Sequence, residues 1–278
     1  TSSEPTTNFV VGDISVSGGS LSSFSTTSTS IDQMGNDLDG EAANDQSGAS
    51  VSLNSDGDRV AIGAYLNDGT GTNAGHVRIY SWDGSSWSQL GSDINGEVTG
   101  DQSGWCVSLD SDGDRVAIGA YTNDGNGSNA GHVRVYEYSG GSWSQLGNDI
   151  DGEAANDYSG WSVSLDSDGD RVAIGAYTND GNGPDAGHVR IYSWDGSSWS
   201  QLGSDINGEA AYDYSGYSVS LDSDGDRVAI GATRNDGTGS NAGHTRIYSW
   251  DGSSWSQLGS DIDGEAAGDQ SGYSVSLD

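Results

Sequence analysis

One heptapeptide decides the fold of this chain: Asp114-Arg115-Val116-Ala117-Ile118-Gly119-Ala120. The same seven residues recur at intervals of 56 residues, beginning at Asp58, Asp170 and Asp226. The surrounding sequence repeats with them, since 42 of 56 positions are identical between residues 97–152 and 153–208. A fixed period of this length indicates a repeat architecture, in which one unit cannot bury its apolar face alone. A residue present in every copy is therefore expected to hold the unit together.

Each unit contains short runs in which large and small residues alternate. Residues 104–109 and 115–121 follow the period of two that is typical of half-buried strands. We expect a third strand at 132–136 and a shorter fourth strand at 143–146, before an acidic connection over 147–157. Four short antiparallel strands per repeat form the blade of a β-propeller. The sequence therefore predicts an all-β propeller of four-stranded blades.

The second strand of each blade has two unlike faces. Val116 and Ile118 lie on one face, and Ala117 and Gly119 lie on the other. A face of Ala and Gly allows a neighbouring sheet to approach closely. We therefore expect the bulky side of one blade to pack against the small side of the next, around a hub.

The two ends of the chain leave the number of blades open. Residues 31–278 follow the period, beginning with a fourth strand at 31–38 and ending with a first strand at 271–277. Residues 1–30 lie outside the period and are predicted to form a β-hairpin. If the hairpin completes a closing blade, the propeller has five blades. Alternatively, 31–278 is a fragment of a larger propeller or array, and 1–30 is the remnant of a preceding β-sandwich domain.

The charge of the chain limits its partners. It has 42 acidic and nine basic residues, for a net charge of −33. This charge argues against nucleic acid, whose phosphates it would repel, and favours cations and solubility in saline water. No stretch approaches the ~20 apolar residues of a membrane span, so membrane insertion is not expected. The single cysteine, Cys106, rules out an intrachain disulfide and is interpreted as a replacement for Ser. Because the chain begins at Thr1, without a Met, we interpret it as a piece of a longer polypeptide.

Several stretches of the repeat carry a family resemblance. Residues 101–109 (DQSGWCVSL) and 116–121 (VAIGAY) resemble FG-GAP repeats, the units of the integrin alpha-chain propeller. Residues 87–90 (WSQL) and 131–136 (GHVRVY) resemble the subgroup found in bacterial surface proteins. The resemblance covers 31–278 and implies a propeller used for adhesion or recognition outside the cell, usually without catalysis.

The repeat also departs from the family pattern at two motif positions and in one loop. Ser103 stands where the family has Phe, and Tyr or Thr replaces the family's Pro at Tyr65, Tyr121, Tyr177 and Thr233. The acidic turn is shorter than the calcium loop of the integrins.

That acidic turn is the first candidate metal site. Alternate carboxylates around a Gly, as in Asp110-Ser111-Asp112-Gly113-Asp114, suit Ca²⁺, which prefers oxygen ligands. Asp is also favoured in tight turns for its local hydrogen bonds, and the Arg that follows can neutralise it. Both interpretations stay open. The candidate Ca²⁺ ligands are Asp56, Asp58, Asp110, Asp112, Asp114, Asp166, Asp168, Asp170, Asp222, Asp224 and Asp226.

Two further polar patterns recur. The connection carries Asp149, Asp151, Glu153 and Asp157, which either bind a cation or form a solvated acidic loop. A His opens each third strand, and an Arg follows it on the same face. This pair allows a metal ligand or a general base, or a structural pairing with Asp. The four histidines are His76, His132, His188 and His244.

Aromatic residues occupy two repeated positions. One is a hairpin with an aromatic residue on each side of its turn, which either offers a platform for sugars or packs the blade. The other is the residue after Ser-Gly, which varies between copies and is a candidate for ligand selectivity. The candidate ligand-binding residues are Trp82, Trp87, Trp105, Trp161, Trp194, Trp199, Tyr217, Trp250 and Trp255.

The sequence thus favours a non-enzymatic adhesion or spacer module, with Ca²⁺ as a structural ion. The residues that break the repeat are scattered and form no nucleophile–base pair. The expected partner is a glycan or protein of a cell surface, or another copy of the chain. A multivalent carbohydrate-binding propeller and a subunit of a surface filament are the alternatives. The chain is predicted to be bacterial and secreted or at the cell surface, in a marine or saline setting.

Overall fold

The computed structural model describes residues 33–277, and Gly35 begins one compact unit that holds all of the repeats. The hairpin predicted within 1–30, and with it the five-blade closure, lies outside the described residues. The described part contains strands and turns and no helix, so the all-β prediction is confirmed. No helix in this part has the length and apolar character that crossing a membrane requires.

Within residues 33–277, twenty strands form four sheets of the same design. The first sheet contains β1 (Ser50–Leu53), β2 (Arg59–Ala64), β3 (His76–Trp82), β4 (Trp87–Gln89) and β5 (Ile94–Asn95). The second contains β6 (Cys106–Leu109), β7 (Arg115–Ala120), β8 (His132–Ser139), β9 (Ser142–Gln145) and β10 (Ile150–Asp151). The third contains β11 (Ser162–Leu165), β12 (Arg171–Ala176), β13 (His188–Trp194), β14 (Trp199–Gln201) and β15 (Ile206–Asn207). The fourth contains β16 (Ser215–Leu221), β17 (Arg227–Ala232), β18 (His244–Trp250), β19 (Trp255–Gln257) and β20 (Ile262–Asp263).

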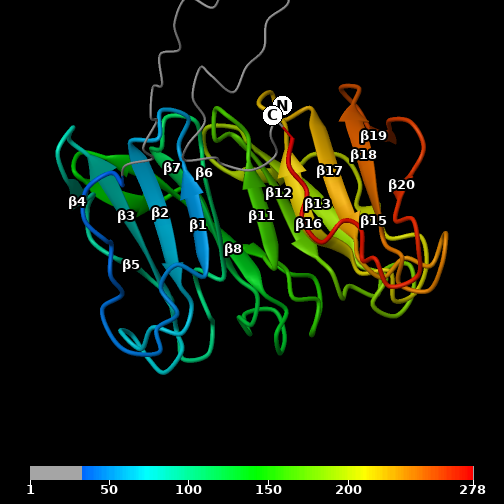
Figure 1. The fold of residues 1–278 in the computed structure, drawn as a ribbon, viewed down its shortest axis with the longest axis horizontal. Helices are drawn as coiled ribbons and strands as arrows, with labels where there is room; N and C mark the ends of the chain where they lie inside the picture. Colours follow the sequence, from blue (N-terminus) through cyan, green and yellow to red (C-terminus); the bar gives the residue numbers. More distant parts are fainter. Residues whose placement is uncertain (1–32, 278) are drawn as a thin grey trace, which may run out of the picture. The chain divides into compact units, whose positions relative to one another are not determined.

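Four strands of each sheet follow one another as an antiparallel meander, as predicted for a blade. Figure 1 shows the blades side by side, with the first strands β1, β6, β11 and β16 toward the middle of the unit. The fifth strand was not predicted. In the second blade, β9 pairs with the later half of β8, which leaves His132 and Val133 free to pair with Asp151 and Ile150. Part of the acidic connection is therefore a strand.

The two strands predicted at the ends of the repeats are not formed in the described residues. Residues 33–38 contain no strand, and the rest of that prediction is outside the described part. Residues 272–277 are also not a strand, since no described segment pairs with them. They still lie on the fourth blade as a first strand would, because the Leu277 N–H donates to Ser220 Oγ at 3.0 Å.

The blades pack small side against bulky side, as the sequence predicts. Ala117 of the second blade lies in one buried cluster with Val172 and Ile174 of the third. A Cβ added to Gly119 would lie 2.1 Å from the carbonyl oxygen of Gly160, so only glycine permits this approach. Serine hydroxyls join the first strands, since backbone N–H groups at Leu109, Leu165 and Leu221 donate to Ser52, Ser108 and Ser164 at 2.9–3.0 Å.

The first and fourth blades each expose apolar side chains whose equivalents in other blades are buried. Leu53 is 60% exposed, whereas its equivalent Leu165 is 7% exposed. Ile262 is 55% exposed, whereas its equivalent Ile206 is 5% exposed. Burial of these positions therefore depends on a neighbouring blade rather than on the residue.

Candidate binding sites at the blade joints

A pocket recurs where the connection from one blade meets the third and fourth strands of the next. Three equivalent pockets have volumes of about 270, 290 and 370 Å³. Each is lined by an indole, a phenol and at least one hairpin serine from one blade, and by Asp, Ile, and Asn or Asp from the connection. The central residues of the three are Tyr136, Trp143, Asp93 and Asn95; Tyr192, Trp199, Asp149 and Asp151; and Tyr248, Trp255, Asp205 and Asn207.

The tryptophan of each pocket is held rigidly. Trp199 lies opposite Trp194 across the hairpin, with ring centroids 5.4 Å apart. Its indole N–H donates to the backbone carbonyl of Leu146 in the preceding blade at 2.8 Å, and Trp143 and Trp255 make the same bond. Gly147, at a φ of +80°, lies against the edges of both rings. The hairpin aromatics therefore serve packing, and the half-buried fourth-strand tryptophan also forms a fixed pocket wall.

Carboxylates supply the polar side of the pockets. Gln145 Nε2 donates to Asp149 Oδ1 at 2.6 Å, which fixes the orientation of this carboxylate. Burial, together with the neighbouring charge of Asp149, raises the pKa of Asp151. Asp151 and its equivalents Asn95 and Asn207 have exposed side chains that can hydrogen-bond a ligand.

A second recurring cluster lies at the start of each third strand. The His side chain is 1% exposed and faces a Glu from the preceding connection and an Asp from its own blade. The three ligand atoms of each set lie within 4.8 Å of one another. The sets are Glu41, His76 and Asp93; Glu97, His132 and Asp149; Glu153, His188 and Asp205; and Glu209, His244 and Asp261. Burial lowers the pKa of His132 and of His188 to about 4, so both are neutral at pH 7.

The acidic connection is therefore not one cation site. Asp149 faces His132, whereas Glu153, four residues later, faces His188 of the next blade. The hypothesis that this connection wraps a single ion is wrong for these two residues, because the extended backbone carries them to different blades.

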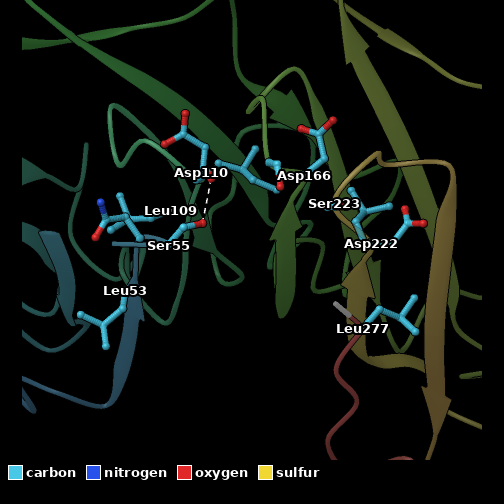
Figure 2. Close-up of a pocket in the computed structure, with 13 residues that line it drawn as sticks. Leu53, Ser55, Leu109, Asp110, Asp166, Asp222, Ser223 and Leu277 are labelled. Carbon is cyan, nitrogen blue, oxygen red and sulfur yellow. Dashed lines mark hydrogen bonds between the residues drawn. The ribbon is translucent and has the colours of Figure 1, made fainter. Parts of the chain in front are cut away.

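The acidic turns surround a different pocket, of about 200 Å³, at one end of the first strands. Figure 2 shows leucines and serines of this pocket together with Asp110, Asp166 and Asp222, and the first turn contributes Asn54 at the same position. Successive turns are joined by backbone bonds, from Ser55 N to Ser111 O at 3.1 Å and from Ser111 N to Ser167 O at 3.0 Å. The turns around this pocket thus link each blade to the next.

The turn oxygens are largely used by the protein itself. Asp110 Oδ1 accepts from the backbone N–H of Arg115 at 3.0 Å, as expected for a side chain that caps a turn. Arg115 Nη1 donates to the Gly169 carbonyl of the next turn at 3.2 Å, so a guanidinium already lies there. Asp112 and Asp168 are exposed. This arrangement fits Ca²⁺ poorly, and calcium at the turns stays a prediction.

An arc of aromatic rings lies at the opposite end of the first strands. Trp105 and Trp161 have ring centroids 4.7 Å apart, Trp161 and Tyr217 5.5 Å, and Tyr217 and Tyr273 5.1 Å. Tyr121 and Tyr177 fill the spaces between them. The residues at the variable position after Ser-Gly thus contribute to a continuous, partly exposed surface of aromatic side chains.

The predicted ligand-binding residues therefore divide between two places. Trp82, Trp87, Trp194, Trp199, Trp250 and Trp255 lie in the hairpins, and Trp105, Trp161 and Tyr217 lie in the arc. Sequence reasoning missed Tyr192 and Asp149 as pocket walls, together with their equivalents. Their presence in every copy was a signal, but the pocket needs residues from two adjacent blades.

These features define a repeat protein of the β-propeller class, with equivalent sites at its joints. The family model for the FG-GAP repeat matches residues 38–80, 95–136, 150–192 and 207–248, which is more than half of the chain. The chain belongs to the FG-GAP repeat family. A comparison with curated protein sequences finds no match.

Solved structures of propeller-like proteins share the fold. A periplasmic gluconolactonase of Pseudomonas aeruginosa has a TM-score of 0.54 and 13% identity, over 80% of this chain and 58% of that protein. A protein from Bacteroides uniformis assigned as a 6-phosphogluconolactonase has a TM-score of 0.50 and 9% identity, over 77% of this chain and 54% of that protein. The chain thus spans a little over half the length of each, and at these identities the likeness concerns the fold alone.

Proposed function

We propose that this chain is a non-enzymatic recognition module that binds carbohydrate at its blade joints and serves adhesion. FG-GAP repeats typically occur in extracellular proteins, and this setting fits such a role. The observation that carries the proposal is the recurrence of one pocket, with the same wall types, at three joints. A bacterial source in saline water stays part of the proposal, supported by the net charge of −33.

The pocket walls match the chemistry of a sugar ring. The fixed indole of Trp199 and the phenol of Tyr192 offer apolar surface for the C–H face of a pyranose. Asp149 and Asp151 accept hydrogen bonds from its hydroxyl groups, and serine hydroxyls lie at the rim. Because the pockets are shallow, each site alone is expected to bind weakly, and several sites on one rigid module gain avidity on a dense glycan surface.

Catalysis is not part of the proposal. The joints carry nearly the same groups, so none gathers the unusual residues that mark an active site. Glu137, one residue that breaks the repeat, forms an ion pair with Arg115 at 3.1 Å instead. The likeness to lactonases is one of fold, which hosts many functions.

A glycan array probed with the intact chain tests the proposal. Binding should disappear in the triple variant Trp143→Ala, Trp199→Ala and Trp255→Ala. Because these indoles also pack the joints, a second triple variant changes only exposed side chains: Asn95→Ala, Asp151→Ala and Asn207→Ala. It should keep the fold by circular dichroism and still lose binding. Full binding by both variants would overturn the proposal, and loss only in Trp105→Ala and Trp161→Ala would move the site to the arc.

Self-association is a second candidate function, because the first blade exposes Val51 and Leu53 and the fourth exposes Leu258 and Ile262. They occupy the positions that form the two halves of a joint, and three such joints are buried in the described part of the chain. Growth of the particle mass with protein concentration in light scattering would support a filament subunit, and a constant mass would exclude it.

A further inference from the structure

The four Glu–His–Asp sets share an unexplained feature, which is a buried imidazole with at least one ring nitrogen that lacks a hydrogen bond. Both ring nitrogens of His76, His188 and His244 are buried and lack a hydrogen-bond partner, and so does Nε2 of His132. Leaving such a polar atom unsatisfied in the interior normally destabilises the fold. The same cost recurs in every repeat, which indicates that the imidazole meets a partner other than a protein atom.

The imidazole is aimed at two carboxylate oxygens. His188 Nδ1 lies 3.8 Å from Glu153 Oε2 and 3.8 Å from Asp205 Oδ2. In the fourth blade the corresponding distances from His244 are 3.9 Å to Glu209 and 3.7 Å to Asp261. These gaps are too long for hydrogen bonds. They leave one space that all three ligand atoms face.

The other oxygen of each carboxylate is already held by the protein. Gln201 Nε2 donates to Asp205 Oδ1 at 2.7 Å, and Arg190 Nη1 lies 3.6 Å from Glu153 Oε1. Each carboxylate therefore turns one oxygen outward to a fixed partner and the other inward to His188. Outer partners of this kind orient the ligands of protein-bound metals. The arrangement recurs in the other three sets with Gln89, Arg78, Gln145, Arg134, Gln257 and Arg246.

We propose that each set binds one divalent transition-metal ion, represented by Zn²⁺, through the His Nδ1, one Glu oxygen and one Asp oxygen. Ligand bonds of about 2.0–2.2 Å around tetrahedral Zn²⁺ place ligand atoms roughly 3.4 Å apart. The His–carboxylate gaps of 3.7–3.9 Å would close by a few tenths of an ångström, and the remaining pairs, which lie within 4.8 Å, by up to about 1.4 Å. An imidazole nitrogen among the ligands favours such a metal over Ca²⁺ or Mg²⁺, which prefer all-oxygen sites. Water completes the coordination.

The ion would join parts of the chain that are distant in sequence. Glu153 belongs to the connection that enters the third blade, whereas His188 opens β13 and Asp205 follows β14. Arg190 already ties this connection to the blade through the Asp151 carbonyl at 2.8 Å. A metal bond adds to that tie at each joint, so its role is structural. The metal sites and the carbohydrate pockets share Asp93, Asp149 and Asp205, but the Glu and His ligands lie outside the pocket lining.

The test is titration of the EDTA-treated chain with Zn²⁺ by calorimetry, in 0.15 M NaCl with Ca²⁺ and Mg²⁺ in excess. We expect about four Zn²⁺ ions per chain and a higher melting temperature. Replacing all four glutamates with Ala should abolish this binding, and replacing one should remove one equivalent. These side chains are 44–47% exposed, so the variants are expected to fold.

Glu265 provides a matched control. It occupies the same repeat position as Glu41, Glu97, Glu153 and Glu209 but belongs to none of the described sets. Glu265→Ala should therefore keep the full stoichiometry. Co²⁺ bound in place of Zn²⁺ should give a visible spectrum that the fourfold Glu variant lacks.

Three results would overturn the proposal: no Zn²⁺ binding in the presence of Ca²⁺ and Mg²⁺, equal loss in Glu265→Ala, or unchanged stoichiometry in the fourfold variant. Each of these three results can be distinguished from a failure of the carbohydrate proposal. The glutamate variants leave the tryptophan walls intact, and the tryptophan variants leave every Glu–His–Asp set intact.

Discussion

Replacing Leu165 with Ala should destabilise the unit far more than the same change at Leu53. Both residues end a first strand within the same Ser-Val-Ser-Leu motif. Leu165 is 7% exposed and belongs to a buried cluster with Val133, Ile150 and Val172, whereas Leu53 is 60% exposed. The pair therefore separates the effect of a neighbouring blade from that of the residue.

The expected magnitudes follow from burial. A buried Leu→Ala change costs about 2–5 kcal/mol, of which the cavity it leaves is one part. We expect about 3 kcal/mol for Leu165→Ala, since its cluster is closed by two blades. At Leu53 less than half of the side chain is removed from water, and no closed cavity results. The loss there should be below about 1 kcal/mol.

Guanidinium unfolding, followed by tryptophan fluorescence, measures both losses. The slope of free energy against denaturant should be compared first, because repeat proteins can unfold in parts. A loss at Leu53 equal to that at Leu165 would refute the reasoning. It would mean that the first blade's exposed face is covered in solution, by another copy or by another part of the chain.

Two further changes test the joints and the acidic turns. Gly119→Ala should lower the melting temperature strongly or prevent folding, since the added Cβ would lie 2.1 Å from the Gly160 carbonyl oxygen; a melting curve like that of the unchanged chain would contradict the packing. Burial, together with the adjacent carboxylate, raises the pKa of Asp110 and of Asp166 to about 6 in the folded state, above the ordinary 3.8. The folded chain thus binds these protons more tightly than the unfolded chain, so their contribution to stability grows as pH falls from about 7 toward 4. Asn54 occupies the equivalent position in the first blade, so both residues can be changed to Asn. The double variant should have a higher melting temperature at pH 7.5, and its melting temperature should rise less when the pH is lowered to 5. An unchanged pH dependence of the melting temperature would contradict these pKa values.

The site predictions from the sequence succeeded least where a site draws on two blades. The hairpin tryptophans were recognised as paired aromatics, but their pocket needs the connection of the preceding blade as its other wall. The histidines were expected to bind a metal, to act as a general base or to pair with Asp, and each faces an Asp and, in addition, a Glu that was not predicted. Which Glu and which Asp meet could not be read from spacing, since Glu153 is 21 residues from His132 but 35 residues from its partner His188.

The sequence alone determined the blade: its period, its meander of strands, and the small and bulky faces of residues such as Gly119 and Ile118. These are local properties, because side chains alternate along a strand whatever lies nearby. The tertiary structure decided which copies of a residue are buried and which acidic groups gather around each His. Those outcomes depend on the path of the connection between blades. That path is set by long-range pairing, such as that of Ile150 with Val133, which no local pattern encodes.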